Sequence, residues 1–460
     1  MKCTTGLVLA LVTLLGGAAR AEEWTGPYLI SEYLGGIKPA TCKECLPSYR
    51  TCVVWQFYDG ARWTLAYREF YFQYGWQGEW PVCYGEEAVN PSLAGANRSD
   101  GQPEYWCVWE RREDTCGSIH VAAYRFNDWD YQVSIGNCIN TDGDSARPDV
   151  VVIADDSLED IVWAAWTNHD SSGWYIQYTY TLDDTWTLPS SAVLSRTDPI
   201  RHTRLGRGRL NDTTGCPLLV WESNGDIFYS EYTEGKWQTA IEVAHSDSLD
   251  RNPDVVSFTT DPGYGPWVTW ESTRDGDTAV YGTGENSFSI GVRWCDSAGA
   301  GRNFSPCGNP ASYPKKGWDE WAVAAWVSDR DGNPNIYART RFADSEARLD
   351  ADTATDVSPA VTTFGLTLHW CVWQSNRGGS WNIWGSLMDA MESSVDRAAA
   401  GMSADVMSPA TIARGLPPGA VAFDAMGRRA VNPRSGICFV RDEGRGARDA
   451  GRTRKVIIER

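Results

Sequence analysis

The chain has 460 residues, with 60 Asp and Glu against 41 Lys and Arg, so its net charge is −19. A nucleic-acid binder needs a basic face that displaces counterions, and this charge argues against that class of protein. Apolar residues make up 42%, too many for a disordered chain, while 24 Trp and 44 Gly indicate short strands, tight turns and large rings packed between sheets.

Residues 1–21 have the pattern of a secretory signal peptide. Lys2 precedes an apolar run from Leu7 to Leu15, and Ala19-Arg20-Ala21 provides small residues for cleavage. The run is too short to span a membrane, and no later stretch approaches a membrane span. We therefore expect a secreted or outer-surface attached protein without a transmembrane segment; the alternative is a buried N-terminal helix.

Export permits disulfides, and twelve cysteines follow residue 21: Cys42, Cys45, Cys52, Cys83, Cys107, Cys116, Cys138, Cys216, Cys295, Cys307, Cys371 and Cys438. Their spacing does not define the pairing. Cys42 and Cys45 form a C-x-x-C pair, but neither a second such pair nor a His cluster accompanies it. We expect a disulfide or free thiols there, with a metal or redox site as the alternative. Cys52, Cys107 and Cys371 lie in apolar strand patterns, where thiols are buried like small hydrophobes.

One pattern recurs seven times: an apolar run ending in Trp, a polar turn, and then an aliphatic residue, typically Ile followed by an aromatic residue. The tryptophans are Trp55, Trp109, Trp166, Trp221, Trp270, Trp326 and Trp373. The aliphatic landmarks are Leu65, Ile119, Ile176, Ile227, Val280, Ile336 and Ile383, ten residues after the Trp in six repeats and six residues after it in the fourth. A period of about 50 residues predicts one propeller blade per repeat.

The residue three positions before each Trp is also large or apolar: Cys52, Trp106, Trp163, Leu218, Trp267, Val323 and Trp370. An odd offset places the two residues on opposite faces of a strand, so both faces of each sheet are buried, as between neighbouring blades. Tight turns follow at Asp59-Gly60, Gly225-Asp226, Asp275-Gly276, Asp331-Gly332 and Gly378-Gly379. Trp129, Trp186 and Trp237 mark further strands, and Asn90-Pro91, Arg147-Pro148, Asn252-Pro253, Asn309-Pro310 and Ser358-Pro359 are expected at strand entries.

The segment from Trp326 to Tyr337, WVSDRDGNPNIY, resembles the repeats of TolB-like and sialidase-like β-propellers, and the segments after Trp270 and Trp373 are weaker copies. The resemblance covers about residues 40–410. It implies an all-β fold with a seven-bladed β-propeller over residues 22–410 and a small C-terminal β tail. Six blades with one degenerate repeat are the alternative. The motif consists of turn and packing residues, so it implies a fold and no activity.

The charge reverses near Gly401: residues 401–460 carry 11 Lys and Arg against 6 Asp and Glu. The segments Phe423–Arg429, Ser435–Arg441 and Arg452–Arg460 resemble, in order and spacing, the end of the C-terminal sorting domain of the type IX secretion system, although Cys438 stands where the family usually has Tyr and the upstream part is poorly represented. The resemblance implies that residues 411–460 are a sorting tail, which contacts the sorting and export machinery. A strand pair that closes the propeller is the alternative.

Arg274, Arg330 and Arg377 occupy the same place in three repeats, four residues after the Trp. A guanidinium group binds carboxylates in a bidentate fashion, and sialidase-like propellers use an arginine triad, so these residues are candidate ligand-binding residues. However, they lie in hairpin turns, whereas the family's triad projects toward the axis. The alternative is that each is a turn residue paired with a neighbouring Asp.

No cofactor or resident metal is expected. The Asp-rich turns at Asn140–Asp144 and Asp329–Asn333 could hold Ca²⁺ through oxygen ligands, but neither has the spacing of a known calcium loop, and turn chemistry explains the same residues. The five histidines are scattered, without metal-ligand spacing, and no nucleophile-elbow, zinc-protease or phosphate-loop motif is present.

We therefore expect a binding module rather than an enzyme, with an extracellular glycan or protein as its partner and one propeller face as its binding surface. The alternative is a sialidase-like glycoside hydrolase. A cluster of Arg, Tyr and paired carboxylates in the central channel would favour the hydrolase, and a channel mouth without that convergence would favour binding.

Overall fold

The computed structural model describes residues 24–389 with gaps, and five C-terminal segments, 411–413, 420–423, 429–430, 436–442 and 453–458. The gaps are 33–34, 44–49, 73, 84–85, 98–102, 113–116, 126–127, 139–145, 154–159, 183–184, 196, 210–214, 245–247, 257–266, 285–291, 296–301, 312–320, 341–344, 351 and 365–367. The expected signal peptide and the turn at Asn140–Asp144 lie outside the described residues. Within the described part, no helix has the length and apolar character needed to cross a membrane.

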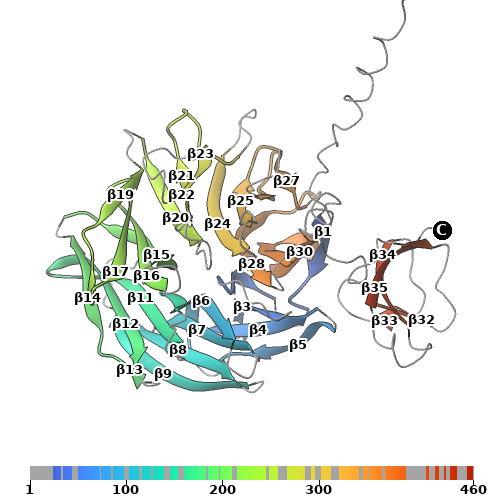
Figure 1. The fold of residues 1–460 in the computed structure, drawn as a ribbon, viewed down its shortest axis with the longest axis horizontal. Helices are drawn as coiled ribbons and strands as arrows, with labels where there is room; N and C mark the ends of the chain where they lie inside the picture. The colour runs from blue at the N-terminus through green and yellow to red at the C-terminus, as the bar shows by residue number, and fades with distance from the viewer. Residues whose placement is uncertain are drawn as a thin grey trace, which may run out of the picture.

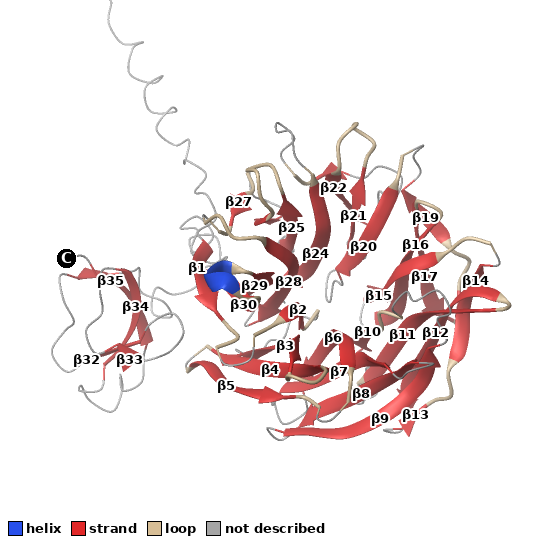
Figure 2. Cartoon of the chain, turned by 180° about the vertical axis from the view of Figure 1, so that it is seen from behind, coloured by secondary structure: helices blue, strands red, loops and turns tan. Residues whose placement is uncertain are grey.

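The described strands between Trp24 and Asp389 form seven antiparallel sheets, which are arranged like blades around a central axis (Figure 1). The same ring is seen from the opposite side in Figure 2. Each blade has an innermost strand, a second strand, a third strand and an outer strand in sequence from the axis. This architecture confirms the predicted all-β, seven-bladed propeller.

The first four blades follow the chain in order. Blade 1 contains β2 (Ile37–Thr41), β3 (Arg50–Tyr58), β4 (Trp63–Tyr71) and β5 (Gly75–Pro81). Blade 2 contains β6 (Ala88–Asn97), β7 (Pro103–Arg112), β8 (Gly117–Arg125) and β9 (Asp128–Cys138). Blade 3 contains β10 (Asp149–Ile153), β11 (Ile161–Asp170) and β12 (Gly173–Leu182), with an outer strand in two parts, β13 (Thr185–Trp186) and β14 (Ser190–Ser195). Blade 4 contains β15 (Ile200–Arg209), β16 (Gly215–Ser223) and β17 (Asp226–Thr233), with outer parts β18 (Lys236–Trp237) and β19 (Ile241–Ala244).

The last three blades complete the ring. Blade 5 contains β20 (Asp250–Val256), β21 (Trp267–Ser272), β22 (Ala279–Gly284) and β23 (Val292–Arg293). Blade 6 contains β24 (Asn303–Ala311), β25 (Trp321–Ser328), β26 (Asn335–Thr340) and β27 (Ala347–Arg348). Blade 7 contains β28 (Asp356–Phe364), β29 (Leu368–Ser375) and β30 (Asn382–Asp389), with the short 3₁₀ turn η2 (Arg377–Gly379) between the last two. Its outer strand is β1 (Trp24–Leu29), which pairs with β30 from the other end of the chain.

A separate five-stranded sheet contains the C-terminal strands β31 (Thr411–Ala413), β32 (Ala420–Phe423), β33 (Arg429–Ala430), β34 (Gly436–Asp442) and β35 (Thr453–Ile458). Strand β34 pairs with β32 and β35 and with no blade strand. The alternative in which a C-terminal strand pair closes the propeller is therefore wrong, because β1 closes it. The described blade strands lie within the predicted range 22–410, and the separate sheet lies within 411–460.

The seven repeat tryptophans lie on the second strands and are at most 3% exposed. The residue after each Trp pairs with the aliphatic landmark of the third strand, as in Gln56 with Leu65 and Glu222 with Ile227. The glycines of the predicted hairpin turns have positive φ, for example 99° at Gly60, a conformation that glycine adopts without strain. The repeat pattern therefore predicted the strands and the turns between them, and the structure adds their register.

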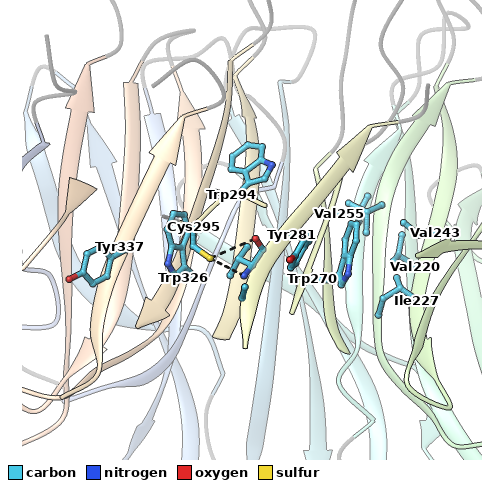
Figure 3. Close-up of a cluster of buried hydrophobic side chains, with 14 of the residues drawn as sticks. Val220, Ile227, Val243, Val255, Trp270, Tyr281, Trp294, Cys295, Trp326 and Tyr337 are labelled. Carbon is cyan, nitrogen blue, oxygen red and sulfur yellow. Dashed lines mark hydrogen bonds between the residues drawn. The ribbon is translucent and has the colours of Figure 1, made fainter. Parts of the chain in front are cut away.

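Neighbouring blades pack through the two faces of the second strand, as predicted. Trp166 of blade 3 packs in one cluster with Trp106 of blade 2. In Figure 3 Trp326 of blade 6 lies beside Cys295 of blade 5 in a continuous apolar cluster. Trp55 of blade 1 packs with blade 7, which completes the apolar ring. Burial of large rings between every pair of neighbours is the main stabilising contribution that this sequence offers.

The structure describes the side chains of eight cysteines: Cys42, Cys52, Cys83, Cys107, Cys216, Cys295, Cys307 and Cys371. All but Cys307 are buried, which agrees with the expectation for Cys52, Cys107 and Cys371. Cys45 lies outside the described residues, so the disulfide or free thiols expected at the C-x-x-C pair stay a prediction.

Candidate functional site at the channel mouth

Six blades have a non-glycine residue in the left-handed conformation at or just before the start of the innermost strand. These residues are Lys38, Asn90, Arg147, His202, Asn252 and Ser358, with φ between 45° and 55°. This conformation is uncommon for residues with a side chain and costs free energy, so its repetition around the axis indicates a position that the surrounding contacts enforce. We call these six residues the mouth ring.

The prediction that Pro residues mark the first residue of a strand is wrong for three innermost strands, because the Pro lies inside the strand, next to the mouth ring. Pro91, Pro253 and Pro359 follow ring residues inside the innermost strands, where the register with the second strand shifts. A bulge leaves one residue unpaired, so a residue without an N–H group is tolerated there. In blade 6 the bulge lies between Phe304 and Cys307, so Asn309-Pro310 is not the equivalent dipeptide.

Hydrogen bonds between blades hold the ring residues in place. The Lys38 N–H donates to Gln374 Oε1 of blade 7 at 2.7 Å, and the Asn90 N–H donates to Gln56 Oε1 of blade 1 at 2.8 Å. Each acceptor is the residue directly after a repeat Trp. The buried Trp thus positions a polar side chain that fixes the strained backbone of the next blade.

Ring side chains also bond within their own blades. Asn90 Nδ2 donates to Glu110 Oε2 at 2.9 Å, and Asn252 Nδ2 donates to Glu271 Oε1 at 2.6 Å. His202 Nδ1 lies 2.9 Å from Glu222 Oε2 in the same arrangement. These contacts tie each of the three ring side chains to the second strand of its own blade.

The ring surrounds a cavity of about 350 Å³ on the propeller axis. Its lining residues are Lys38, Pro39, Ala40, Thr41, Lys43, Asn90, Pro91, Ser92, Arg147, Pro148, Asp149, His202, Arg204, Asn252, Pro253, Asp254, Pro306, Cys307, Ser358, Pro359, Ala360 and Val361. A cavity of this size is in the range that small-molecule ligands occupy. The antiparallel pairing places its mouth on the face that carries the turns between second and third strands, which we call the mouth face.

Two ion pairs lie deeper in the cavity. Lys43 of blade 1 reaches Asp149 of blade 3 and also donates to the Leu205 carbonyl of blade 4 at 3.4 Å. Asp149 accepts from the Leu205 N–H at 2.7 Å. Arg204 Nε lies 3.5 Å from Asp254 Oδ1 of the next blade. The two carboxylates of the lining are therefore both engaged with a cation.

Two ring residues at the mouth are cations, Lys38 of blade 1 and Arg147 of blade 3. Partial desolvation of the Lys38 ammonium group lowers its pKa, repulsion from Arg147 and Arg112 lowers it further, and Glu110 opposes the shift. Burial also lowers the pKa of His202, against the hydrogen bond with Glu222, and the nearby arginines add to the effect. At neutral pH His202 is therefore neutral, and the remaining cations at the mouth repel one another.

The structure places the predicted ligand-binding residues Arg274, Arg330 and Arg377 in equivalent turns of blades 5, 6 and 7, and none lines the cavity. In each case the guanidinium stacks on an aromatic ring of the third strand and Nε contacts a Ser two residues earlier. The rings are those of Tyr281, Tyr337 and Trp384, at 4.4, 4.2 and 4.2 Å, and the serines are Ser272, Ser328 and Ser375. Ligand binding by these three residues stays a prediction.

Each of the three arginines also contacts a carboxylate. Arg274 lies 3.4 Å from Asp250, and Arg330 pairs with Glu346. Arg377 contacts Asp350, Asp352 and Asp356, which are the three carboxylates in the described part close enough together to suit a cation. Its guanidinium lies among them, and burial lowers its pKa to about 10.

The Asp329–Asn333 turn, the second calcium candidate, has arginine partners as well. Asp329 Oδ2 lies 2.9 Å from Arg302 Nε, and Asp331 Oδ2 lies 2.9 Å from Arg348 Nη1. Asp331 also accepts a hydrogen bond from Tyr337 at 2.5 Å. These contacts are the turn chemistry that the sequence offered as the alternative to calcium, and calcium binding stays a prediction.

Sequence reasoning missed the mouth ring, although two signals pointed to it. X-Pro dipeptides occur at this position in six of the seven repeats, and the fourth repeat has His202-Thr203 there. The residue after the repeat Trp is Gln or Glu in five repeats, at Gln56, Glu110, Glu222, Glu271 and Gln374. A polar residue that recurs beside a buried landmark indicates a repeated structural position whose side chain makes hydrogen bonds.

Comparison with known proteins finds similarity to solved structures alone. No protein-family model matches the chain, and no curated protein matches it. Among solved structures, an α-L-arabinanase of Penicillium chrysogenum shares 14% identity at a TM-score of 0.45, covering 66% of this chain and 94% of its own. A lectin of Aleuria aurantia shares 9% at 0.44, covering 71% and 99%, and a Hadza microbial sialidase shares 13% at 0.40, covering 66% and 65%.

Proposed function

We propose that this protein is a binding module that takes an extracellular glycan at the channel mouth. The observation that carries the proposal is the axial cavity of about 350 Å³, open to the mouth face and ringed by polar residues in an enforced left-handed conformation. Backbone strain that the surrounding contacts maintain is concentrated at functional sites. Every blade except the sixth contributes a described ring residue, so the whole propeller acts as the scaffold of one site.

The chemistry of the mouth suits a ligand rich in hydroxyl groups. The amides of Asn90 and Asn252 each donate one N–H to a Glu, and their second N–H groups and remaining lone pairs, with the hydroxyl of Ser358, are donors and acceptors at the ring. Two exposed aromatic residues lie on the mouth face: Tyr58, 57% exposed, ends the second strand of blade 1, and Trp381, 39% exposed, lies in the equivalent turn of blade 7. Exposed flat rings are suited to stacking on sugars.

The hydrolase alternative has less support from this geometry. Glycoside hydrolysis needs one carboxyl group as acid and a second as base or nucleophile. The carboxylates of the lining, Asp149 and Asp254, contact Lys43 and Arg204, and no Tyr is among the described lining residues. The convergence that would favour the hydrolase is therefore incomplete, and binding is the better account.

The test is a glycan array probed with the full-length protein, together with fluorogenic glycosides. The site variant is Asn90→Gly with Asn252→Gly, which keeps the left-handed backbone and removes both amides. The matched control is Asn224→Gly, an exposed turn residue with φ of 54° that does not line the cavity. We expect glycan binding that the double variant weakens and the control retains. Turnover of a glycoside by the wild type, lost in the double variant, would establish the hydrolase instead.

We also propose that the protein is exported and that residues 411–460 direct its sorting. The support is the signal-peptide pattern of residues 1–21 and the placement of the basic C-terminal segments in a sheet of their own, outside the blades. The test is to compare cell fractions for the full chain and a chain ending at residue 410, in a host with the type IX pathway. Retention of the shortened chain in the periplasm is expected, and its normal export would refute the sorting role.

A further inference from the structure

The lining of the axial cavity is positive in a protein that is strongly negative. Four Lys or Arg residues line it, Lys38, Lys43, Arg147 and Arg204, against the two aspartates Asp149 and Asp254. The whole chain, by contrast, has a net charge of −19. A cationic cavity embedded in an anionic molecule concentrates negative ligands at its mouth and repels positive ones.

Two of the four cations lie at the entrance and two lie deeper. The deeper cations, Lys43 and Arg204, are matched by Asp149 and Asp254. Lys38 and Arg147 are both exposed ring residues, from blades 1 and 3. Lys38 Nζ donates to Asn90 Oδ1 at 2.7 Å, a neutral acceptor that leaves the ammonium charge uncompensated by that contact.

The electrostatic environment of Lys38 agrees with this distribution. Arg147 and Arg112 both lower its pKa, and the opposing influence of Glu110 is weaker. Like charges that influence one another at a cavity entrance favour the binding of an anionic group between them.

We propose that the mouth ring binds an acidic group of the glycan, a carboxylate or a sulfate, between Lys38 and Arg147. This inference rests on the proposed function and names the class of ligand: an acidic polysaccharide. The guanidinium of Arg147 supplies a planar pair of donors and the ammonium of Lys38 a point charge, while the ring amides bond the neighbouring hydroxyl groups.

The structure itself supplies the variants for the test. Asn occupies the equivalent ring position in blades 2 and 5, at Asn90 and Asn252, with φ of 53° and 50°. Lys38→Asn and Arg147→Asn therefore remove the charge and keep a residue that is known to fit this backbone. Lys236→Asn is the control, because Lys236 is an exposed residue of the outer strand of blade 4, away from the cavity.

Binding is measured by titration calorimetry with the full-length protein. The probes are polygalacturonate for the carboxylate arm, dextran sulfate for the sulfate arm and unmodified dextran as the neutral reference. We expect at least one acidic probe to bind, dextran to bind more weakly, and each ring variant to lose about tenfold or more in affinity, as expected for a lost charge-assisted hydrogen bond. The control variant should bind like the wild type, and added salt should weaken binding to the wild type more than to the ring variants.

The outcomes separate the inference from the proposed function. Binding of dextran as tight as binding of the acidic probes, or no effect of either ring variant, overturns the acidic-group inference and leaves a glycan-binding propeller. Binding of a polyglutamate peptide in place of any polysaccharide overturns it in favour of a protein ligand. If neither these probes nor the glycan array gives binding, the proposed function and the inference both fail.

Discussion

His369 in blade 7 provides a sharp test of the buried architecture. Its side chain is fully buried, Nδ1 lies 2.9 Å from Thr363 Oγ1, and Nε2 has no hydrogen-bond partner in the described structure. Burial lowers its pKa from 6.5 to about 3. Between these two values the unfolded chain takes up a proton at this histidine and the folded chain does not.

The sign of the effect follows from linkage. Above pH 6.5 the histidine is neutral in both states and contributes no pH dependence. As the pH falls below 6.5 the unfolded state gains the proton, so the free energy of unfolding decreases until the pH approaches the folded-state pKa of about 3. At pH 5.0, roughly 1.5 units below the unfolded-state pKa, the loss from this residue is about 2 kcal/mol.

The perturbation is His369→Gln, which removes the titration and keeps a polar group near Thr363. Unfolding by urea is followed through tryptophan fluorescence for the wild type and the variant at pH 7.5 and pH 5.0. The protein is kept dilute, because the isoelectric point is about 4.7. We expect the stability of the wild type relative to the variant to decrease by about 2 kcal/mol between the two pH values.

Other titrating groups cancel in this comparison because both proteins contain them. Burial raises the pKa of Asp356 to about 6, so Asp356 acts in the opposite direction and favours the folded state as the pH falls from about 6 toward 3.8. His202, with a lowered pKa, acts in the same direction as His369. A relative stability that stays constant between pH 7.5 and pH 5.0 would refute the buried, neutral state of His369.

Three further predictions concern the packing and closure of the propeller blades and the C-terminal sheet. Trp326→Ala should lower the free energy of unfolding by about 3–5 kcal/mol, because it empties a fully buried site between blades 5 and 6; an unchanged urea midpoint would show that the indole is not core. Deletion of residues 22–29 removes β1 and exposes the edge of β30, so the melting temperature should fall and aggregation should increase; equal melting curves would contradict closure by β1. Deletion of residues 411–460 should leave the melting temperature of the propeller unchanged, since that sheet pairs with no blade, and a large decrease measured by calorimetry would contradict its independence.

The sequence alone determined the repeat unit and its burial. A Trp such as Trp109 and the apolar landmark Ile119 ten residues later are core residues because local strand geometry places them on faces that neighbouring blades must cover. Glycines such as Gly60 marked the hairpin turns, because positive φ is a local requirement. Properties that depend on a few consecutive residues were therefore readable from the pattern.

The closing strand and the channel mouth were decided only by the tertiary structure. Strand β1 meets β30 across more than 350 positions of the chain, and nothing in the local sequence of Trp24–Leu29 specifies that partner. Lys38 and Arg147 approach the same axis because seven blades complete a circle, a condition that involves every repeat at once. Arg274, Arg330 and Arg377 share a sequence position, but the turns that carry them lie in separate blades and direct each toward its own ring and carboxylate. The spacing in the sequence shows which residues occupy equivalent positions in the repeats. Which of them come into contact depends on how the seven blades close into a circle, because such long-range contacts involve the whole chain.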